Sequence, residues 1–433
     1  MEAFVRENLM NHMIQNKLIS DCQHGFQPKR SCVTQLLIVL EDWSKLIANG
    51  DNIDVIYCDF KSAFDSVPHQ RLLSKLHAYG IRGNLFNWIK AFLTDRRQRV
   101  QLEGQSSDWT EVTSGIPQGT LCGPILFLLF INDLPDKILN TIQIFADDTK
   151  VYNAIKNLDC RNKLQNDIDA LLEWTKLWQL GFNTSKCKIL HIGNSNPEYD
   201  YLMDNKNLEI TKIEKDLGVH IDTNLKFHHH VKEVTKKANQ RLGMIKRTFK
   251  YLDTTAFTYL YIAIIRPILE YANVIWNPRF ICDEEKVERV QRRATKFIPE
   301  LRDLEYEERL IKLNLYSLIY RRRRYDIIQV YRIMNKIDNL DKDKFFIMSR
   351  DTNPYNTKGN SLKNDTRKFS FSQRIIDDWN SLPDDIVCSE SLNVLKCKLD
   401  KFWSGERFKN VSLVRERKTL TQPKTENDHR NTS

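Results

Sequence analysis

The chain has 433 residues, which is long enough to bury a sizeable core and to form two or three domains. Lys and Arg number 66 against 56 Asp and Glu, an excess that favours a polyanionic partner, although a basic soluble protein without one stays open. The nine cysteines are scattered, with no C-x-x-C pair, which indicates a reducing compartment and no structural zinc site. Residues 1–21 carry acids and amides, unlike a signal peptide, and we expect no membrane segment because no uninterrupted apolar run approaches about 20 residues.

Apolar spacing predicts alternating helices and short strands over the first half of the chain. A basic turn leads into an amphipathic helix, and a loop rich in Gly and Pro precedes a strongly apolar helix. The expected elements, in order, are a helix at 1–18, the basic turn at 25–31, a helix at 33–48, a strand at 53–60, helices on either side of 80–83, the Gly-Pro loop at 114–119, a helix at 121–134, a hairpin at 142–152, a helix at 158–180 and a strand at 183–192.

The second half of the chain is predicted to be helical and basic. Between 231 and 252 the apolar residues recur every three or four positions, and Lys and Arg fill many of the intervening positions. Residues 284–298 show the same pattern. A polar stretch at 351–368 indicates a linker, 369–403 a small amphipathic helical module, and 406–433 a disordered tail.

Two adjacent carboxylates, Asp147 and Asp148, fall at the turn of the predicted hairpin. Like charges side by side disfavour burial, so the turn is either solvent-facing or holds a cation. A plain acidic turn explains the pair alone, but Asp59 ends another predicted strand. If the two strands lie side by side, three carboxylates converge, and Mg²⁺ prefers such oxygen ligands. Two such ions can serve an in-line phosphoryl displacement, so acids on strand ends in a basic protein predict nucleotidyl transfer on nucleic acid.

Five motifs occur in a fixed order: Asp59–Asp65, Gly115–Gly119, Phe145–Asp148, Asn183–Lys186 and Leu217–Val219. Together they resemble the successive palm motifs of reverse transcriptases, specifically those of non-LTR (LINE) retrotransposons. Longer stretches, at 117–134 and 265–278, look like the jockey and CR1 type of element. Each motif alone is weak, but the ordered set is specific, and the resemblance extends to about Trp403.

The resemblance implies an α+β fold of the right-hand polymerase type, with partial fingers, a palm built on an antiparallel sheet, a helical thumb and an all-α C-terminal region. The implied domains are fingers and palm at 1–224, thumb at 225–300, a helical extension at 301–349, a polar linker at 350–368, a small helical module at 369–405 and a disordered tail at 406–433.

The same resemblance assigns roles at the site. Asp59 and Asp147 are the carboxylates that bind two Mg²⁺ ions, with Asp148 as a supporting acid and the backbone carbonyl of Phe60 as a further ligand. Lys186 matches a lysine that protonates the leaving pyrophosphate, and its alternative is a solvated surface lysine.

Substrate contacts follow from the remaining motifs. Phe64 looks like the steric gate that rejects a 2′-OH, and its alternative is an ordinary core aromatic. The glycines of 115–119 allow close backbone approach to the nucleotide, although a helix-entry turn would look the same. The implied nucleotide contacts are Pro117, Gln118, Gly119, Lys29 and Arg30, and the implied primer grip is Leu217, Gly218 and Val219.

The chain also departs from the family pattern. Gln27 stands where the family usually has Arg, and Lys29 or Arg30 is expected to replace that contact. The Arg-Pro-x-Ser segment, an endonuclease domain and an RNase H domain are missing from the sequence. We therefore expect an N-terminally truncated copy, with the endonuclease function supplied by a region absent from this chain.

The expected function is RNA-directed DNA synthesis with an RNA template, a DNA primer and dNTPs, acting in the nucleus. Arg321–Arg324 is weak evidence for nuclear import. One alternative is a catalytically inactive RNA-binding protein derived from a retroelement, because of the missing fingers segment. Another is a group II intron-type maturase or an RNA-directed RNA polymerase, and Phe64 counts against the latter because such an enzyme must admit the 2′-OH.

Overall fold

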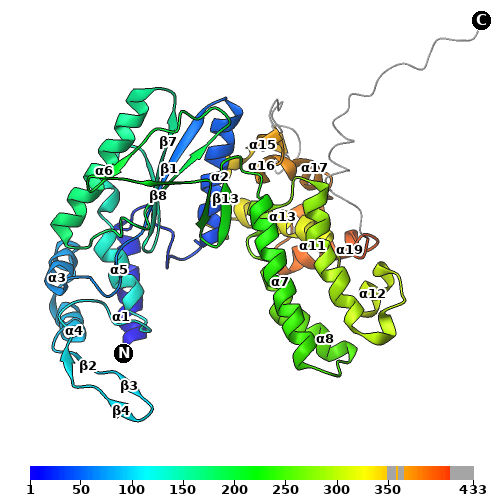
Figure 1. Ribbon diagram of the computed structural model, residues 1–433, viewed down its shortest axis with the longest axis horizontal. Helices are drawn as coiled ribbons and strands as arrows, with labels where there is room; N and C mark the ends of the chain where they lie inside the picture. Colours follow the sequence, from blue (N-terminus) through cyan, green and yellow to red (C-terminus); the bar gives the residue numbers. More distant parts are fainter. Residues whose placement is uncertain (349–356, 359–364, 410–433) are drawn as a thin grey trace, which may run out of the picture. The chain divides into compact units, whose positions relative to one another are not determined.

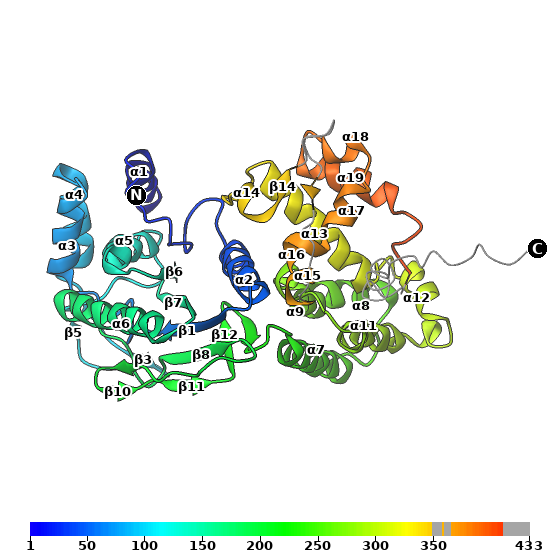
Figure 2. The same ribbon diagram turned by 90° about the horizontal axis from the view of Figure 1, so that it is seen from above.

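The computed structural model describes residues 1–348, 357–358 and 365–409. The chain divides into two compact units, Met1–Leu217 with Asp222–Asn224 and Gly218–Ile221 with Leu225–Ser433 (Figures 1 and 2). Most of the predicted linker and nearly all of the predicted tail lie outside the described residues. Among the described residues, none of the helices is both long enough and apolar enough to span a membrane.

A five-stranded sheet forms the centre of the first unit, in the order β11–β8–β1–β7–β6. Strand β1 is antiparallel to both of its neighbours, with Cys58 opposite Thr149 on β7 and Tyr57 opposite Lys188 on β8. The two acidic strand ends of the sequence therefore lie side by side, as predicted. The strands are β1 (Asn52–Cys58), β6 (Thr141–Phe145), β7 (Asp148–Ile155), β8 (Lys188–Ile192) and β11 (Glu209–Thr211).

The predicted antiparallel sheet is found for four of the five strands, but the sheet is mixed because the edge strand β11 is parallel to its neighbour. Strand β11 runs parallel to β8, with Glu209 opposite Lys188. A parallel return needs a crossover of roughly a dozen residues or more, and the stretch 193–208 supplies it. That crossover carries its own small hairpin of β9 (Leu202–Met203) and β10 (Lys206–Asn207).

Helices cover both faces of the sheet (Figure 2). On one face lies α2, where the ring of Trp43 meets Tyr152 of β7 edge-on with centroids 5.6 Å apart. On the other face, Ile56 and Val151 share a core with α5 and α6. Helix α5 is apolar and buried along nearly its whole length, as expected of a helix enclosed by other elements. The helices of this unit are α1 (Glu2–Gln15), α2 (Cys32–Ala48), α3 (His69–Ala78), α4 (Gly83–Leu93), α5 (Gly123–Ile131) and α6 (Leu158–Trp178).

Short strands complete the first unit and lead into the second. Between α4 and α5 the chain forms a two-part ribbon, in which β2 pairs with β5 and β3 with β4 (Figure 1). Strands β12 and β13 form a hairpin further along the chain. Their bounds are β2 (Arg97–Gln98), β3 (Gln101–Leu102), β4 (Gln105–Ser106), β5 (Thr110–Glu111), β12 (Ile213–Asp216) and β13 (Val219–Asp222).

The second unit is built around α13, which packs against α10, α11, α17 and α19. Segments expected as thumb, extension and small module therefore contribute to one core. Its α-helices are α7 (His228–Thr248), α8 (Thr254–Leu260), α9 (Arg266–Glu270), α10 (Asn273–Trp276), α11 (Ile281–Ala294), α12 (Tyr306–Lys312), α13 (Leu318–Met334), α14 (Lys342–Phe345), α15 (Asp365–Lys368), α16 (Phe371–Arg374), α17 (Ile376–Asn380), α18 (Asp384–Val387) and α19 (Leu392–Phe402).

The C-terminal region is not all-α, so that part of the predicted fold is wrong. Strand β14 (Ile347–Met348) pairs antiparallel with β15 (Thr357–Lys358). Each strand has two residues, and their backbone groups find partners by pairing. A pair this short leaves no period-two pattern, which is why the polar composition of this stretch did not reveal it.

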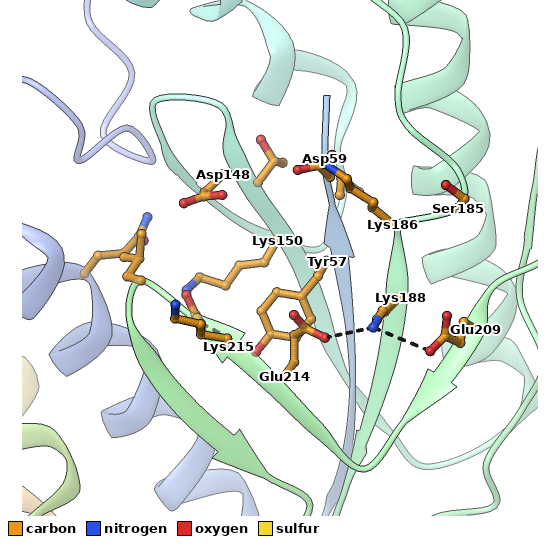
Figure 3. Close-up of a pocket in the computed structure, with 15 residues that line it drawn as sticks. Tyr57, Asp59, Asp148, Lys150, Ser185, Lys186, Lys188, Glu209, Glu214 and Lys215 are labelled. Carbon is orange, nitrogen blue, oxygen red and sulfur yellow. Dashed lines mark hydrogen bonds and ion pairs between the residues drawn. The ribbon is translucent and has the colours of Figure 1, made fainter. Parts of the chain in front are cut away.

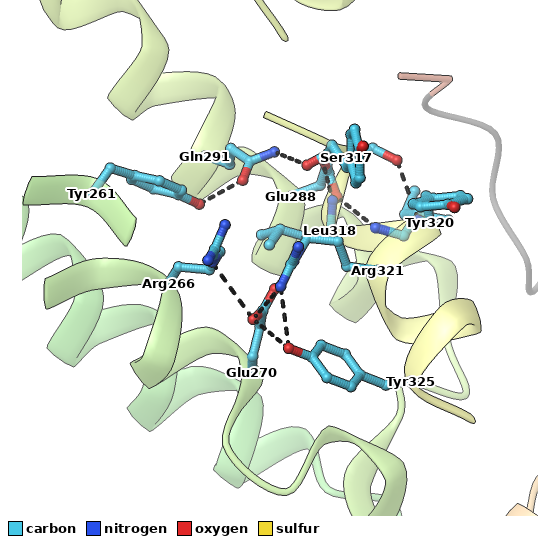
Figure 4. Close-up of polar contacts among 12 residues, drawn as sticks. Tyr261, Arg266, Glu270, Glu288, Gln291, Ser317, Leu318, Tyr320, Arg321 and Tyr325 are labelled. Carbon is cyan, nitrogen blue, oxygen red and sulfur yellow. Dashed lines mark hydrogen bonds and ion pairs between the residues drawn. The ribbon is translucent and has the colours of Figure 1, made fainter. Parts of the chain in front are cut away.

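Each arginine of the run Arg321–Arg324 on α13 forms an ion pair with an acid of its own unit. In Figure 4, Glu270 accepts two hydrogen bonds from Arg321 and lies beside Tyr325. The other pairs are Arg322 with Glu284, Arg323 with Asp378 and Glu406, and Arg324 with Asp400. An import signal has to be exposed, whereas these side chains are at most 18% exposed. The run stabilises the fold and gives no support to nuclear import.

A buried ion pair of the second unit joins Arg374 to Asp326, with both side chains at most 2% exposed. We predict that Arg374→Met will lower the free energy of unfolding by about 3–5 kcal/mol, because Asp326 is left as an uncompensated buried charge. Urea unfolding followed by tryptophan fluorescence measures the loss. The matched control is Arg97→Met, which breaks the exposed pair with Glu111 and should change little. Equal effects of the two substitutions would contradict the prediction.

Candidate active site

The predicted hairpin is formed by β6 and β7, with one of the two adjacent acids in its turn and the other directly after it. Phe145 pairs with Asp148, which leaves Ala146 and Asp147 as the two turn residues. Ala146 has a φ of 55°, the left-handed conformation that tight hairpin turns demand. Asp147 therefore lies at the tip of the hairpin, and Asp148 is the first residue of β7.

Asp59 directly follows β1, at the end of the strand that lies beside the hairpin turn (Figure 3). Its Oδ2 atom is buried and accepts no hydrogen bond from the described residues. Lys186 Nζ lies 3.5 Å from this atom as an ion-pair partner, on a side chain that is otherwise exposed. The backbone carbonyl of Asp59 accepts a hydrogen bond from Asn183 N at 2.7 Å, which ties the start of the 183–186 motif to Asp59.

Burial and neighbouring acids raise the pKa of both acids of the hairpin. Partial burial, opposed by a backbone hydrogen bond and reinforced by Asp59, raises the pKa of Asp147. The pKa of Asp148 is raised to about 6 by burial and then by Asp147 and Asp216, with Lys150 opposing. Carboxylates that repel one another in this way are stabilised by a cation placed between them.

The donor set fits a hard divalent cation that shares its ligands with a substrate. No three His, Cys, Asp or Glu side chains among the described residues form a ready-made metal cage. Mg²⁺ does not need one, because it usually binds one or two carboxylates together with substrate phosphates and water. Asp59, Asp147 and Asp148 supply such oxygens, and the buried Asp59 Oδ2 has no competing hydrogen bond.

A cavity of about 400 Å³ lies beside the acids, on the face of the sheet that α2 covers (Figure 3). Its floor holds a buried ion pair between Lys150 of β7 and Asp216 of β12, and Tyr57 Oη lies 3.5 Å from the same carboxylate. Neither Lys150 nor Asp216 was predicted as a site residue. The available signal was a cation inside the apolar run of β7, two residues after Asp148.

The Gly-Pro turn at 114–119 packs on the loop that follows Asp59. Gln118 Nε2 donates to Asp65 Oδ1 at 2.8 Å, and Ile116 N donates to the carbonyl of Phe64 at 2.8 Å. Gly115 has a φ of 88°, and a Cβ there would lie 2.6 Å from the carbonyl oxygen of Asp65. Glycine is therefore required for this close approach. Pro117 and Gly119 belong to the same turn, so the two motifs form one surface.

The two phenylalanines after Asp59 have different environments. Phe60 is buried, and its ring lies 4.5 Å from that of Phe182. The backbone hydrogen bonds across this contact use the Asp59 carbonyl and the Lys61 amide rather than the Phe60 carbonyl. Phe64 is half-buried and stacks on Phe127 of α5, with ring centroids 4.4 Å apart. Its ring is supported from behind by the core and reaches the surface in front.

In the basic turn at 25–31, Arg30 forms hydrogen bonds to neighbouring residues of the chain. The Arg30 guanidinium donates to the carbonyls of Asp21 and Gln23 and to the Asp21 carboxylate, and the side chain is 8% exposed. Lys29 is exposed. Of the two predicted triphosphate contacts, the structure therefore leaves Lys29 at the surface and holds Arg30 inside the turn.

The predicted primer grip is the turn between β12 and β13. Leu217 and Gly218 both adopt left-handed conformations, with φ values of 44° and 87°, and Val219 opens β13. A Cβ on Gly218 would lie 3.0 Å from Tyr271 Cε1, so a side chain at this position is disfavoured by both conformation and space.

The chain is similar to known proteins. A family model described as "Reverse transcriptase (RNA-dependent DNA polymerase)" matches residues 1–254. The probable RNA-directed DNA polymerase from transposon BS of Drosophila melanogaster is 25% identical over 318 residues, which are 69% of this chain and 34% of that protein. The RNA-directed DNA polymerase from mobile element jockey of the same species is 26% identical over 292 residues, 64% of this chain and 32% of that protein.

The chain spans about a third of the length of these curated relatives. Among solved structures, telomerase from Candida albicans in complex with a telomeric RNA fragment aligns with a TM-score of 0.43 at 10% identity, over 79% of this chain and 52% of that chain. The family model matches more than half of the present chain and includes every motif described above. This chain belongs to the reverse transcriptase (RNA-dependent DNA polymerase) family.

Proposed function

We propose that this chain carries the polymerase of a non-LTR retrotransposon, which extends a DNA primer on an RNA template with dNTPs. The observation that carries the proposal is the convergence of Asp59, Asp147 and Asp148 at one edge of the sheet. The choice of reaction is supported by the relatives from transposon BS and jockey, which are named as RNA-directed DNA polymerases.

Asp59 and Asp147 would hold two Mg²⁺ ions, with Asp148 as the supporting acid and the Phe60 carbonyl as a further ligand. When bound, Mg²⁺ supplies positive charge for the attacking and leaving oxygens of an in-line displacement at the α-phosphate of a dNTP. The raised pKa values of Asp147 and Asp148 reflect a site in which the acids repel one another until positive charge arrives.

Lys186 and Phe64 act on the incoming nucleotide. Lys186 Nζ, held beside Asp59 by their ion pair, carries a proton that can pass to the leaving pyrophosphate. Phe64 rejects a 2′-OH, because its ring is stacked on Phe127 and cannot retreat into the core. Pro117, Gln118 and Gly119 bind the nucleotide, and Asp65 orients the Gln118 amide.

Nucleic acid would bind along α7, whose cations gather away from its buried face. Neutralising phosphates in this way is insensitive to sequence, which suits an enzyme that must copy any template, and an A-like duplex is read by shape and backbone. The turn of Leu217, Gly218 and Val219 would hold the primer strand. The exposed cations of this stretch are Lys232, Lys236, Lys237, Arg241, Lys246, Arg247 and Lys250.

A second candidate function, RNA binding without catalysis, is favoured by one observation. Arg30 is held by Asp21 and Gln23 inside its turn, so the only cation that the turn presents at its surface is Lys29. A weak grip on the triphosphate would leave a protein that binds RNA but extends no primer. Salt-dependent RNA binding without extension, even at high dNTP, would favour this candidate.

The first prediction concerns the acids. Purified protein should extend a DNA primer on an RNA template with Mg²⁺, and Asp59→Asn or Asp147→Asn should each slow extension by at least about 100-fold, because a charged ligand becomes neutral. Chelation with EDTA should stop extension, and added Mg²⁺ should restore it. The matched control is Asp169→Asn, an exposed acid on α6. Extension that survives either substitution would refute the assignment of these acids.

The second prediction concerns sugar selection. Phe64→Ala should raise the preference for rNTP over dNTP by at least about tenfold, because removing the ring opens space for the 2′-OH. Phe64→Tyr keeps the bulk of the ring and should keep the selectivity. Single-nucleotide incorporation, measured as kcat/KM for each sugar, compares the variants. Unchanged selectivity in Phe64→Ala would leave Phe64 as an ordinary core aromatic.

The third prediction concerns α7. Lys236→Gln together with Lys237→Gln should weaken binding to an RNA–DNA duplex and flatten the plot of log affinity against log salt by about one unit per lost phosphate contact. Fluorescence anisotropy over a salt series measures the slope. The matched control is Lys156→Gln with Lys163→Gln, two exposed lysines that are paired with acids in the first unit. The same slope for both double variants would place the duplex elsewhere.

A further inference from the structure

The segment just before the basic turn lies along the outer strand of the sheet. Gln23 forms a parallel bridge with Ile144 of β6, through bonds from Ile144 N to the Cys22 carbonyl at 2.9 Å and from His24 N to the Ile144 carbonyl at 2.8 Å. Ile144 is two residues before Ala146, the first residue of the catalytic turn. The segment is therefore registered directly against the hairpin that carries Asp147.

The side chain of Gln23 reaches into that turn. Its Oε1 atom accepts a hydrogen bond from Ala146 N at 2.9 Å and another from Gly25 N at 2.7 Å. Gln23 is 3% exposed, so water does not compete for these bonds. The acceptor matters because Ala146 adopts a left-handed conformation next to Asp147, and its buried amide would otherwise lack a partner.

Gly25 completes the contact by leaving room for it. A Cβ at this position would lie 2.5 Å from Ala146 N and 3.1 Å from Gln23 Oε1. Its backbone does not have a positive φ, so glycine is needed here for space. The two backbones can approach this closely only because position 25 carries no side chain.

The backbone of Gln23 faces the other way and holds the basic turn. Its carbonyl oxygen accepts Gln27 Nε2 at 2.7 Å and an Arg30 guanidinium nitrogen at 2.9 Å. A single residue thus binds the catalytic turn through its side chain and the proposed triphosphate turn through its main chain. Gln23 therefore gives a direct path by which movement of one turn can reach the other.

We propose that Gln23 is a positioning residue. By holding the Ala146 amide, it fixes the position of the Asp147 side chain and couples that position to the turn at 25–31. The inference rests on the proposed polymerase function, and it assigns to the segment before the basic turn a role that none of the sequence motifs suggested. Gln23 itself touches neither the substrate nor the reacting atoms, so it acts through the hairpin.

The test compares Gln23→Met, which keeps the size and loses the acceptor, with Gln23→Glu, which keeps an acceptor oxygen. Gln23→Met should lower kcat for primer extension by about 10- to 100-fold, because small misplacements of a catalytic group cost this much. The KM for dNTP and the melting temperature should stay near wild type. Gln23→Glu should recover most of the kcat. A kcat that falls equally in both variants, or is unchanged in Gln23→Met, would overturn the proposal.

A second readout does not depend on activity. Hydrogen–deuterium exchange, resolved to the Ala146 amide within residues 142–149, should speed up in Gln23→Met and stay slow in Gln23→Glu. Unchanged exchange in Gln23→Met would overturn the proposal whatever the activity. If wild-type protein extends no primer while Ala146 exchange responds as expected, the polymerase function fails but the contact stands.

A second pair of variants guards against misfolding of Gln23→Met. Gly25→Ala should disturb the same contact and lower kcat with the same faster exchange at Ala146, because its Cβ displaces the turn. Gly405→Ala is the matched control, since a Cβ there meets no atom within 4 Å. If Gly25→Ala behaves like Gly405→Ala in both kcat and exchange, the coupling through this segment is refuted.

Discussion

The antiparallel pairing of β1 with β7 is the constraint on which the site depends. Cys58 lies opposite Thr149. The residue after β1 and the residues before Thr149 therefore lie close together, at the same end of the two strands. Asp59, Asp147 and Asp148 are brought together by backbone register, and burial, reinforced by neighbouring acids, raises the pKa values of the last two. The fold thus places like charges together at a cost that a nearby cation or a bound proton relieves. A shift of one residue in register would turn every side chain of β1 to the opposite face.

Buried polar contacts hold the elements that surround this edge. Lys150 and Asp216 pair beneath the cavity and join the hairpin of β6 and β7 to β12. Such a pair gives little net stability, because desolvation offsets the attraction, but removing one partner is costly. The loss of Lys150 or of Asp216 would therefore leave its partner buried without a counter-charge.

The strands that carry the site could be predicted from the sequence, but the side-chain contacts that support it could not. Alternating apolar residues and a turn were sufficient to predict the hairpin and the strand that ends in Asp59, because those signals are local. The partner of Lys150 depends on the tertiary fold. Lys150 meets Asp216 across 66 positions, and periodicity carries no information about such distant pairs.

The parallel edge strand β11 was missed for the same reason, since its partner is set by a crossover. The cations of Arg321–Arg324 looked like a signal because charge is visible in a sequence and pairing is not.

The ion pair between Asp326 and Arg374 has a consequence for how the chain is made. Helix α13 is the centre of the second unit, yet the charge buried in its middle is neutralised only by a residue 48 positions later. During synthesis, α7, α11 and α13 can associate before Arg374 leaves the ribosome, but they then hold an unpaired carboxylate. The second unit therefore cannot complete its core from the N-terminal side alone. Its last helices have to pack against α13 before this unit is completely folded.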